Sequence, residues 1–264
     1  MPGATTTERS RQMKRTRNGI LIPDVPIMAG GNLPNAIKGV SAGAANKHIV
    51  DLGLPSGIRW GVSNLDLSNE HKLAESPYSY NASYFSWANI DGYAPVNNSF
   101  ANVHNWGDVN SAAPWYNGQP YGDSVGVTAN SDISGNAQYD AATAILGNAW
   151  RMPTRFDYEE LVSHCIFVDA DGVEITTRDK RTTINGVVGF NLQSTENGNR
   201  IFFAALGLGE QEKLSYLGTN AYYWSGSINS ERQSYEFGID ANGVYPDVPR
   251  DRFWGLPIRP VYVG

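Results

Sequence analysis

The sequence predicts an α+β domain built from two helices, twisted antiparallel sheets and a long loop region, with an extended arm in front of it. Charged residues make up only 17% of the 264 residues, while Gly numbers 28 and Tyr 14, a composition typical of turn-rich β or α+β proteins. Two segments show helical signals, and several short apolar segments are separated by turns. We therefore expect an arm over residues 1–47 and one domain over residues 48–264.

Two helices are predicted, one at 138–146 and one directly after Pro153. In the first, apolar residues recur at helical spacing, and Gly147 is a natural stop. In the second, Thr154 suits the N-cap position, and Asp157 three residues later completes a capping-box pattern. The apolar face of the second helix is expected to consist of Phe156, Leu161 and Val162.

Short apolar segments bounded by turns predict the strands. Residues 48–52 and 58–62 flank a turn that has Pro55 at its second position, so they are expected to form a hairpin. A second hairpin is expected around the Asn-Gly turn at 196–199. Residues 88–136 form a long insert without clear periodicity, which is typical of a functional loop or an interface. Further strands are predicted at 84–87, 168–175, 186–192, 200–205, 222–227, 234–239 and 256–263.

The arm differs from the rest of the chain in charge. Residues 1–47 hold seven Lys or Arg against two acidic residues, a net charge of +5, which leaves −11 for the remainder of a chain whose total is −6. A basic segment on an acidic body favours docking on an acidic partner, although a solvated, disordered terminus is the alternative. The apolar residues that follow are broken by prolines and suit an extended segment lying on a neighbour. The expected anchoring residues are Arg11, Lys14, Arg15, Arg17, Ile20, Leu21, Ile22 and Pro23.

The single cysteine excludes an internal disulfide and a cysteine-based zinc site, and Cys165 is expected to be a small buried apolar residue. The four histidines are scattered, and no acidic cluster has the pattern of a calcium loop. No nucleophile elbow or phosphate loop is present. We therefore expect no metal, no cofactor and no enzymatic activity.

Residues 1–19 are polar and basic, without the apolar region of a secretory signal, and no 18-residue apolar run occurs. The expectation is a chain that neither carries such a signal nor inserts into a membrane, the alternative being a leader removed from upstream of Met1. No nucleic-acid partner is expected.

Four motifs rich in aromatic residues, glycine and proline occur in order along the chain, at 50–60, 150–154, 222–227 and 255–261. Together, over roughly residues 48–264, they resemble the Fibrobacter-succinogenes-type major paralogous (FISUMP) domain family, which is common in Bacteroidetes and their phages. The resemblance implies a variant of the C-type lectin fold that serves as a display and binding scaffold. Within the motifs we expect Trp60, Trp150 and Trp224 to be core residues, and Arg151 and Arg259 to pair with buried carbonyls or carboxylates.

The segment 220–254 is crowded with Asn, Tyr, Ser, Asp and Arg, a composition typical of a paratope. It is also similar to the variable face of proteins diversified by retroelements, and an ordinary polar loop is the alternative. The candidate ligand-binding residues are Asn220, Tyr222, Tyr223, Asn229, Arg232, Tyr235, Asp247, Arg250, Arg252, Phe253 and Trp254.

The resemblance and the basic arm together predict a virion surface protein of a Bacteroidetes phage, such as a head fibre or capsid decoration protein. Its arm would bind the capsid or another virion protein, and its domain would adhere to a glycan or protein of the host surface. One alternative is a bacterial cell-surface adhesin. The other is a purely structural oligomerisation module, and a homodimer or homotrimer is expected because weak single contacts gain from multivalency.

Overall fold

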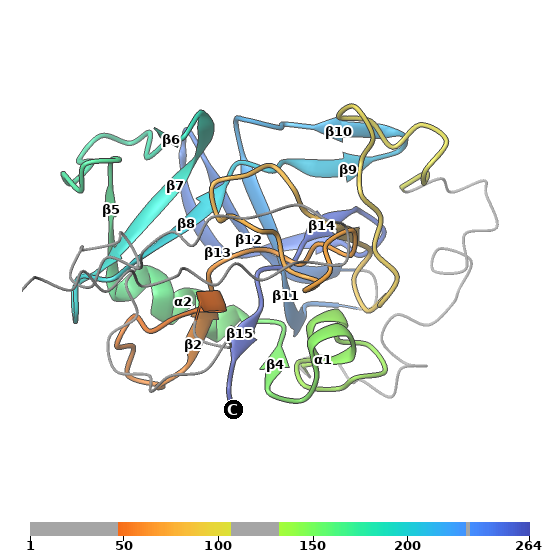
Figure 1. Cartoon of the computed structure of the whole chain (residues 1–264), viewed down its shortest axis with the longest axis horizontal. Helices are drawn as coiled ribbons and strands as arrows, with labels where there is room; N and C mark the ends of the chain where they lie inside the picture. Colours follow the sequence, from red (N-terminus) through yellow and green to blue (C-terminus); the bar gives the residue numbers. More distant parts are fainter. Residues whose placement is uncertain (1–46, 107–131, 231–232) are drawn as a thin grey trace, which may run out of the picture. The chain divides into compact units, whose positions relative to one another are not determined.

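The computed structural model describes residues 47–106, 132–230 and 233–264 (Figure 1). This part of the chain is β-rich, with 39% strand and 9% helix. The predicted α+β, C-type-lectin-like class is therefore wrong. Both predicted helices are present, but they span only six and nine residues, and helices this short depend on packing against the sheets. Apart from Lys47, the predicted arm lies outside the described residues, as do residues 107–131 of the long insert.

The first sheet brings together three of the four motifs. Its antiparallel order is β1 (Ile49–Val50), β2 (Arg59–Gly61), β15 (Val261–Tyr262) and β4 (Trp150–Arg151). The predicted hairpin of β1 and β2 is confirmed, and its turn closes with Gly57 N–H donating to Leu54 O at 2.8 Å. Because β15 pairs with both β2 and β4, the C-terminal motif fixes the first and middle motifs to each other.

The second sheet is organised around its longest strand, β7 (Val187–Ser194). One edge of β7 pairs with β5 (Cys165–Val168) and β6 (Thr182–Ile184), and the other edge pairs with β8 (Arg200–Ala204). The predicted hairpin of β7 and β8 is confirmed, with Gly198 at φ +74° in its turn. Glycine adopts this left-handed conformation without the penalty that a Cβ would carry.

A three-stranded meander follows: β11 (Ala221–Ile228), β12 (Gln233–Asp240) and β13 (Gly243–Asp251). The first two strands were predicted, but β13 was not, because Pro246 and Pro249 argue against a strand in the middle of a sheet. The structure places β13 at the end of the meander, where proline is tolerated. Two small antiparallel pairs complete the strands, β9 (Leu208–Glu210) with β10 (Lys213–Ser215), and β3 (Tyr84–Phe85) with β14 (Leu256–Pro257).

The two helices are α1 (Ala141–Leu146) and α2 (Arg155–Ser163). The buried carboxylate of Asp140 caps α1 and accepts bonds from Ala142 N–H at 2.8 Å and Thr143 N–H at 3.1 Å. The predicted capping box of α2 is confirmed, since Thr154 and Asp157 bond each other's backbone N–H groups. The predicted apolar face is wrong at Phe156, which is 58% exposed, because Tyr158 and Leu161 are the apolar residues that α2 buries.

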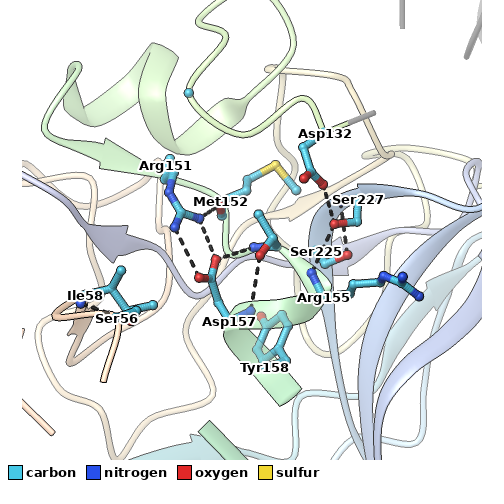
Figure 2. Close-up of polar contacts among 12 residues, drawn as sticks. Ser56, Ile58, Asp132, Arg151, Met152, Arg155, Asp157, Tyr158, Ser225 and Ser227 are labelled. Atoms are coloured by element: carbon cyan, nitrogen blue, oxygen red, sulfur yellow. Dashed lines mark hydrogen bonds and ion pairs between the residues drawn. The ribbon is translucent and has the colours of Figure 1, made fainter. Parts of the chain in front are cut away.

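Figure 2 shows how the middle motif is tied to α2. Arg151 donates two hydrogen bonds to the Asp157 carboxylate, at 2.6 and 3.2 Å, and a third to Met152 O at 2.9 Å. Asp157 therefore serves two purposes, as part of the capping box and as the ion-pair partner of Arg151. The expectation that Arg151 pairs with a carboxylate is confirmed.

The core is mostly aromatic. Trp60 and Trp224 are fully buried, as predicted, whereas Trp150 is only partly buried and packs edge-on against Tyr262 at 5.1 Å between ring centroids. On α2, Tyr158 stacks on Phe237 of β12 at 4.5 Å, which joins the helix to the meander. Cys165 is buried, as predicted.

Arg259 is fully buried and, as expected, bonds backbone carbonyls. It donates to Val62 O and Phe202 O, each at 2.9 Å, to Gly61 O at 3.3 Å, and to the Asn64 side chain at 2.7 Å. Its guanidinium also lies 4.7 Å from the ring centroid of Phe203, a cation–π contact. These contacts connect the end of β2, the strand β8 and the C-terminal motif.

We predict that Arg259→Met lowers the free energy of unfolding by at least about 3 kcal/mol, because it leaves several buried acceptors without a donor. The measurement is a denaturant titration of the full chain, with the exposed Arg178→Met as the matched control. The control should change stability by less than about 0.5 kcal/mol. A similar loss in both variants would contradict the structural role of Arg259.

We also predict that the thiol of Cys165 is inert in the folded chain. Burial first, and the charge of Glu196 second, raise the pKa of Cys165 to about 12, so little thiolate forms near neutral pH. A disulfide-exchange reagent at pH 8 should label the folded protein at least about a hundredfold more slowly than the unfolded one. Because the chain has one cysteine, rapid labelling of the native protein would contradict this prediction directly.

Candidate functional site

The meander β11–β12–β13 has two different faces, because side chains alternate along each strand. On the inner face Tyr223 pairs across the strands with Phe237, and both are fully buried against the core. On the outer face Tyr222 lies opposite Gly238, and Gly238 lies opposite Tyr245. The register therefore places one tyrosine on each side of Gly238.

This arrangement forms a groove of about 370 Å³ on the outer face of the meander. Gly238 is itself buried, and a Cβ built there would lie 3.7 Å from each of three neighbours, the side chains of Tyr222, Glu236 and Val248. Those are ordinary van der Waals distances, so a methyl group would fit at this position. The side chains that line the groove belong to Tyr222, Glu236, Asp240, Tyr245, Val248 and Arg250.

An ion pair lies at one end of the groove. Glu236 is fully buried, and Arg250 donates to its two carboxylate oxygens at 2.7 and 3.0 Å. Burial raises the pKa of the Glu236 carboxyl, and the hydrogen bonds and charge of Arg250 oppose that rise. A bidentate pair of this kind has a fixed geometry, so it presents the rest of the guanidinium to the groove in one orientation.

Tyr222 is held in place by three neighbours. The guanidinium carbon of Arg250 lies 5.1 Å from its ring centroid, Asn220 Nδ2 donates to its hydroxyl at 2.6 Å, and Tyr216 packs edge-on at 6.0 Å. These three contacts hold the ring in one orientation, so it needs little further ordering to contact a ligand.

Tyr245 forms the opposite wall and is 40% exposed. The stretch from Tyr245 to Val248 has one residue more than the stretch of β12 that it faces, which makes a β-bulge in β13. Asp240 closes the other end of the groove, where its Oδ1 accepts from Asn242 N–H at 2.6 Å and Gly243 N–H at 3.1 Å in the β12–β13 turn.

Of the predicted ligand-binding residues, Tyr222 and Arg250 line the groove and Asn220 supports it. Asp247 is exposed in the bulge of β13, next to the groove. Asn229 lies where β11 turns into β12, and its backbone N–H donates to Gln233 O at 3.0 Å. Arg232 lies outside the described residues.

The other predicted residues lie away from the groove. Tyr223 is a core residue, since its hydroxyl donates to Ala204 O at 2.9 Å and none of it reaches the surface. Tyr235 projects to the inner side, 5.0 Å from Arg155. Buried Arg252 lies 4.6 Å over the Trp87 ring, and the half-buried Phe253 and Trp254 pack on each other beyond β13.

The candidate ligand-binding residues did not include Glu236, Gly238, Asp240, Tyr245 and Val248, although all five lie in the segment 220–254. The first three alternate along β12 with Phe237 and Ile239, which is the pattern of a strand with one buried face. That signal could have assigned them to one outer face. Tyr245 and Val248 could be placed in the groove only from the pairing of β13 with β12, and the prolines of β13 made that strand hard to predict.

A second hollow of about 310 Å³ lies beside the first sheet, and Leu73, His48, His71, Trp150 and Tyr262 are among the residues that line it. Burial, Lys47 and His71 all lower the pKa of His48, so its ring is neutral near pH 7. The hollow has no ion pair of the Glu236–Arg250 kind among its lining residues. The groove on the meander is therefore the stronger candidate for a binding site.

Within the described residues there is no cluster of three or more His, Cys, Asp or Glu side chains arranged to hold a metal ion. Neither α1 nor α2 has the length and apolar character that crossing a membrane requires, and no other helix in the described ranges does. Comparisons with protein-family models, curated proteins and solved structures found no match to this chain.

We predict that Arg250→Met destabilises the fold by about 3–5 kcal/mol at pH 7.5, because Glu236 is left buried and unpaired. The variant should recover stability as the pH falls. Its Glu236 pKa, already raised by burial, loses the opposing guanidinium, so the folded state holds a proton at a higher pH than the unfolded state does.

The measurement is the unfolding midpoint in urea between pH 7.5 and 5.5. The double variant Glu236→Gln and Arg250→Met is the control, because it has no titrating group at this position. The gap between the single and double variants should shrink as the pH falls. A gap that is independent of pH would show that Glu236 is not the group responsible.

Proposed function

We propose that this chain is a non-catalytic binding domain carried on a surface, and that the groove on β11–β12–β13 is its contact site. The observation that carries the proposal is the groove itself, which is lined by two tyrosines and a fixed ion pair. Aromatic and Arg side chains that are already held in position are the residues that contribute most to binding sites.

The spacing of its carboxylates favours binding over glycoside hydrolysis. Glu236 and Asp240 are four residues apart on one face of β12, which is about 13 Å along a strand. Glycosidases place their two catalytic carboxyl groups about 5–9.5 Å apart. In addition, Glu236 is occupied by Arg250, so it is poorly placed to exchange a proton with a substrate.

In this proposal the domain is carried on the surface of a phage particle. The chain is then a head fibre or capsid decoration protein that adheres to the host. The support is the resemblance of the four motifs to FISUMP domains and the net charge of +5 over residues 1–47, which suits an anchor on an acidic virion protein. A bacterial surface adhesin would use the same groove.

We predict that the phage carrying the double variant Tyr222→Ala and Tyr245→Ala assembles normally and adsorbs to host cells at least about tenfold less than wild type, because the walls of the groove are removed. Phe156→Ala is the matched control, since this exposed aromatic residue lies on α2. The readouts are the protein content of purified particles by mass spectrometry and the fraction of particles adsorbed.

Absence of the chain from particles, together with its presence in cell envelopes, would favour the bacterial adhesin. Particles that fail to assemble with the double variant would favour an oligomerisation module. Normal adsorption by the double variant would contradict the binding role of the groove.

We predict that replacing Arg11, Lys14, Arg15 and Arg17 by Ser in the full chain reduces its incorporation into particles. The reason is the loss of charge attraction to an acidic partner, which salt should also weaken in the wild type. The measurement is the ratio of this chain to the major capsid protein in particles purified at low and high salt. Incorporation that is unchanged at both salt concentrations would contradict the anchoring role of the arm.

A further inference from the structure

We propose that the hollow beside the first sheet is a second binding site, and that its ligand is a small monocarboxylate with an aromatic or branched apolar body. The inference goes beyond the proposed function, because the hollow shares no lining residue with the groove on β11–β12–β13. Three features of the hollow support it: an apolar lining, basic side chains without acidic partners, and a volume that suits a small molecule.

The apolar part of the lining comes from four separate places in the chain. Leu73 is buried, and Leu146 is partly buried at the end of α1. Trp150 of β4 lies directly opposite Tyr262 of β15 in the first sheet, and the two rings pack edge-on at 5.1 Å between centroids. Strand pairing therefore holds both rings in place. Together these side chains offer a surface that the apolar body of a ligand can cover.

Three basic side chains line the same hollow. Lys47 and His48 directly precede β1, and His71 lies on the loop that follows β2. The rings of His48 and His71 are 5.8 Å apart between centroids. No Asp or Glu is among the lining residues, and across the described residues neither the Lys47 ammonium nor either ring has a hydrogen bond or an ion pair. These basic groups therefore lie together without a counterion, on a body whose net charge over residues 48–264 is −11.

The crowding of basic groups affects His48 directly. Burial first, then the charges of Lys47 and His71, lower the pKa of His48, and Tyr262 of β15 lines the same hollow. A carboxylate bound here would bring the opposite charge that the hollow lacks. Because a nearby anion favours the protonated ring, such a ligand would raise the pKa of His48 again.

The size and charge of the hollow favour a small, singly charged ligand. Its volume is about 310 Å³, near the lower end of the range of about 300–1,000 Å³ found for small-molecule sites. Since a water molecule takes about 30 Å³ in the liquid, the hollow has room for roughly ten non-hydrogen atoms. That is the size of one ring with a short carboxylate side chain. Because His48 is neutral near pH 7, a monoanion matches the charge of the hollow better than a phosphate does.

The test is an NMR titration of the full chain with hydrocinnamate, which is a phenyl ring joined to a carboxylate by a short chain. The ring protons of the four histidines are followed, and His48→Gln and His71→Gln assign two of the signals. We expect the signals of His48 and His71 to shift saturably, with a dissociation constant of about 1 mM or lower. The signals of His104 and His164, which do not line the hollow, should stay in place. Absence of saturable binding would overturn the inference.

Three matched probes separate the parts of the ligand. Hydrocinnamide keeps the ring and has no charge, acetate keeps the carboxylate and has no ring, and inorganic phosphate is an anion of a different class. Each should bind at least about tenfold more weakly than hydrocinnamate. Equal binding of the acid and its amide would overturn the charge argument, and phosphate that binds as tightly as the acid would overturn the ligand class.

Lys47→Met tests the basic side of the hollow without touching the core. The side chain is exposed, so the unfolding midpoint should not change, while hydrocinnamate should bind about threefold more weakly. Lys213→Met is the matched control, since this exposed lysine on β10 does not line the hollow. Equal binding by both variants would contradict the role of Lys47.

The pH dependence gives an independent readout. Hydrocinnamate should bind about threefold or more tightly at pH 6.0 than at pH 7.5, because its carboxylate stays ionised in this range while the histidine rings of the hollow gain protons. The double variant His48→Gln and His71→Gln should lose this dependence. A dependence that survives in a folded double variant would overturn the inference, because the groups responsible would then lie elsewhere.

Discussion

The rest of the described structure depends on the contacts that the buried guanidinium of Arg259 makes. Among the residues that the structure describes it has no carboxylate partner, and its charge is compensated instead by three backbone carbonyls, an amide oxygen and the face of Phe203. Such a charge is tolerated only if the groups around it keep their positions, because each lost contact leaves an unpaired buried polar group. Arg259 thereby fixes β2 and β8 relative to the C-terminal strand. Tyr223, whose ring centroid lies 6.0 Å from the same guanidinium, brings β11 into this arrangement.

The groove is a consequence of that fixed core. Because Tyr223, Phe237 and Ile239 pack on the inner face of the meander, a shift of β12 by one residue would move its inner-face side chains to the outer face. The core therefore determines which side chains face outward, and it keeps Tyr222, Gly238 and Tyr245 in line. Glu236 is fully buried although it lies on the outer face, and its ion pair with Arg250 makes that burial tolerable.

Local features of the fold could be predicted from the sequence. The capping box of Thr154 and Asp157, the hairpin turn near Gly198 and the burial of Trp60 each depend on a few neighbouring residues or on a large apolar side chain. The fold class could not be predicted, because strands of two or three residues such as β14 and β9 have too little periodicity to detect. The groove was predicted in part, through Tyr222 and Arg250. Its remaining residues meet only through the pairing of β12 with β13, which is information that a single strand does not contain.

Pro246 and Pro249, which argued against predicting the strand β13 from the sequence, also affect how copies of this domain behave when they are crowded together. A strand at the end of a sheet can recruit a strand from another molecule through its free backbone groups. Pro246 and Pro249 have no N–H to donate, and the bulge between Tyr245 and Val248 bends the edge away from a regular ladder. Many copies held at high local density can thus keep their meanders separate, so that each groove stays open to the medium.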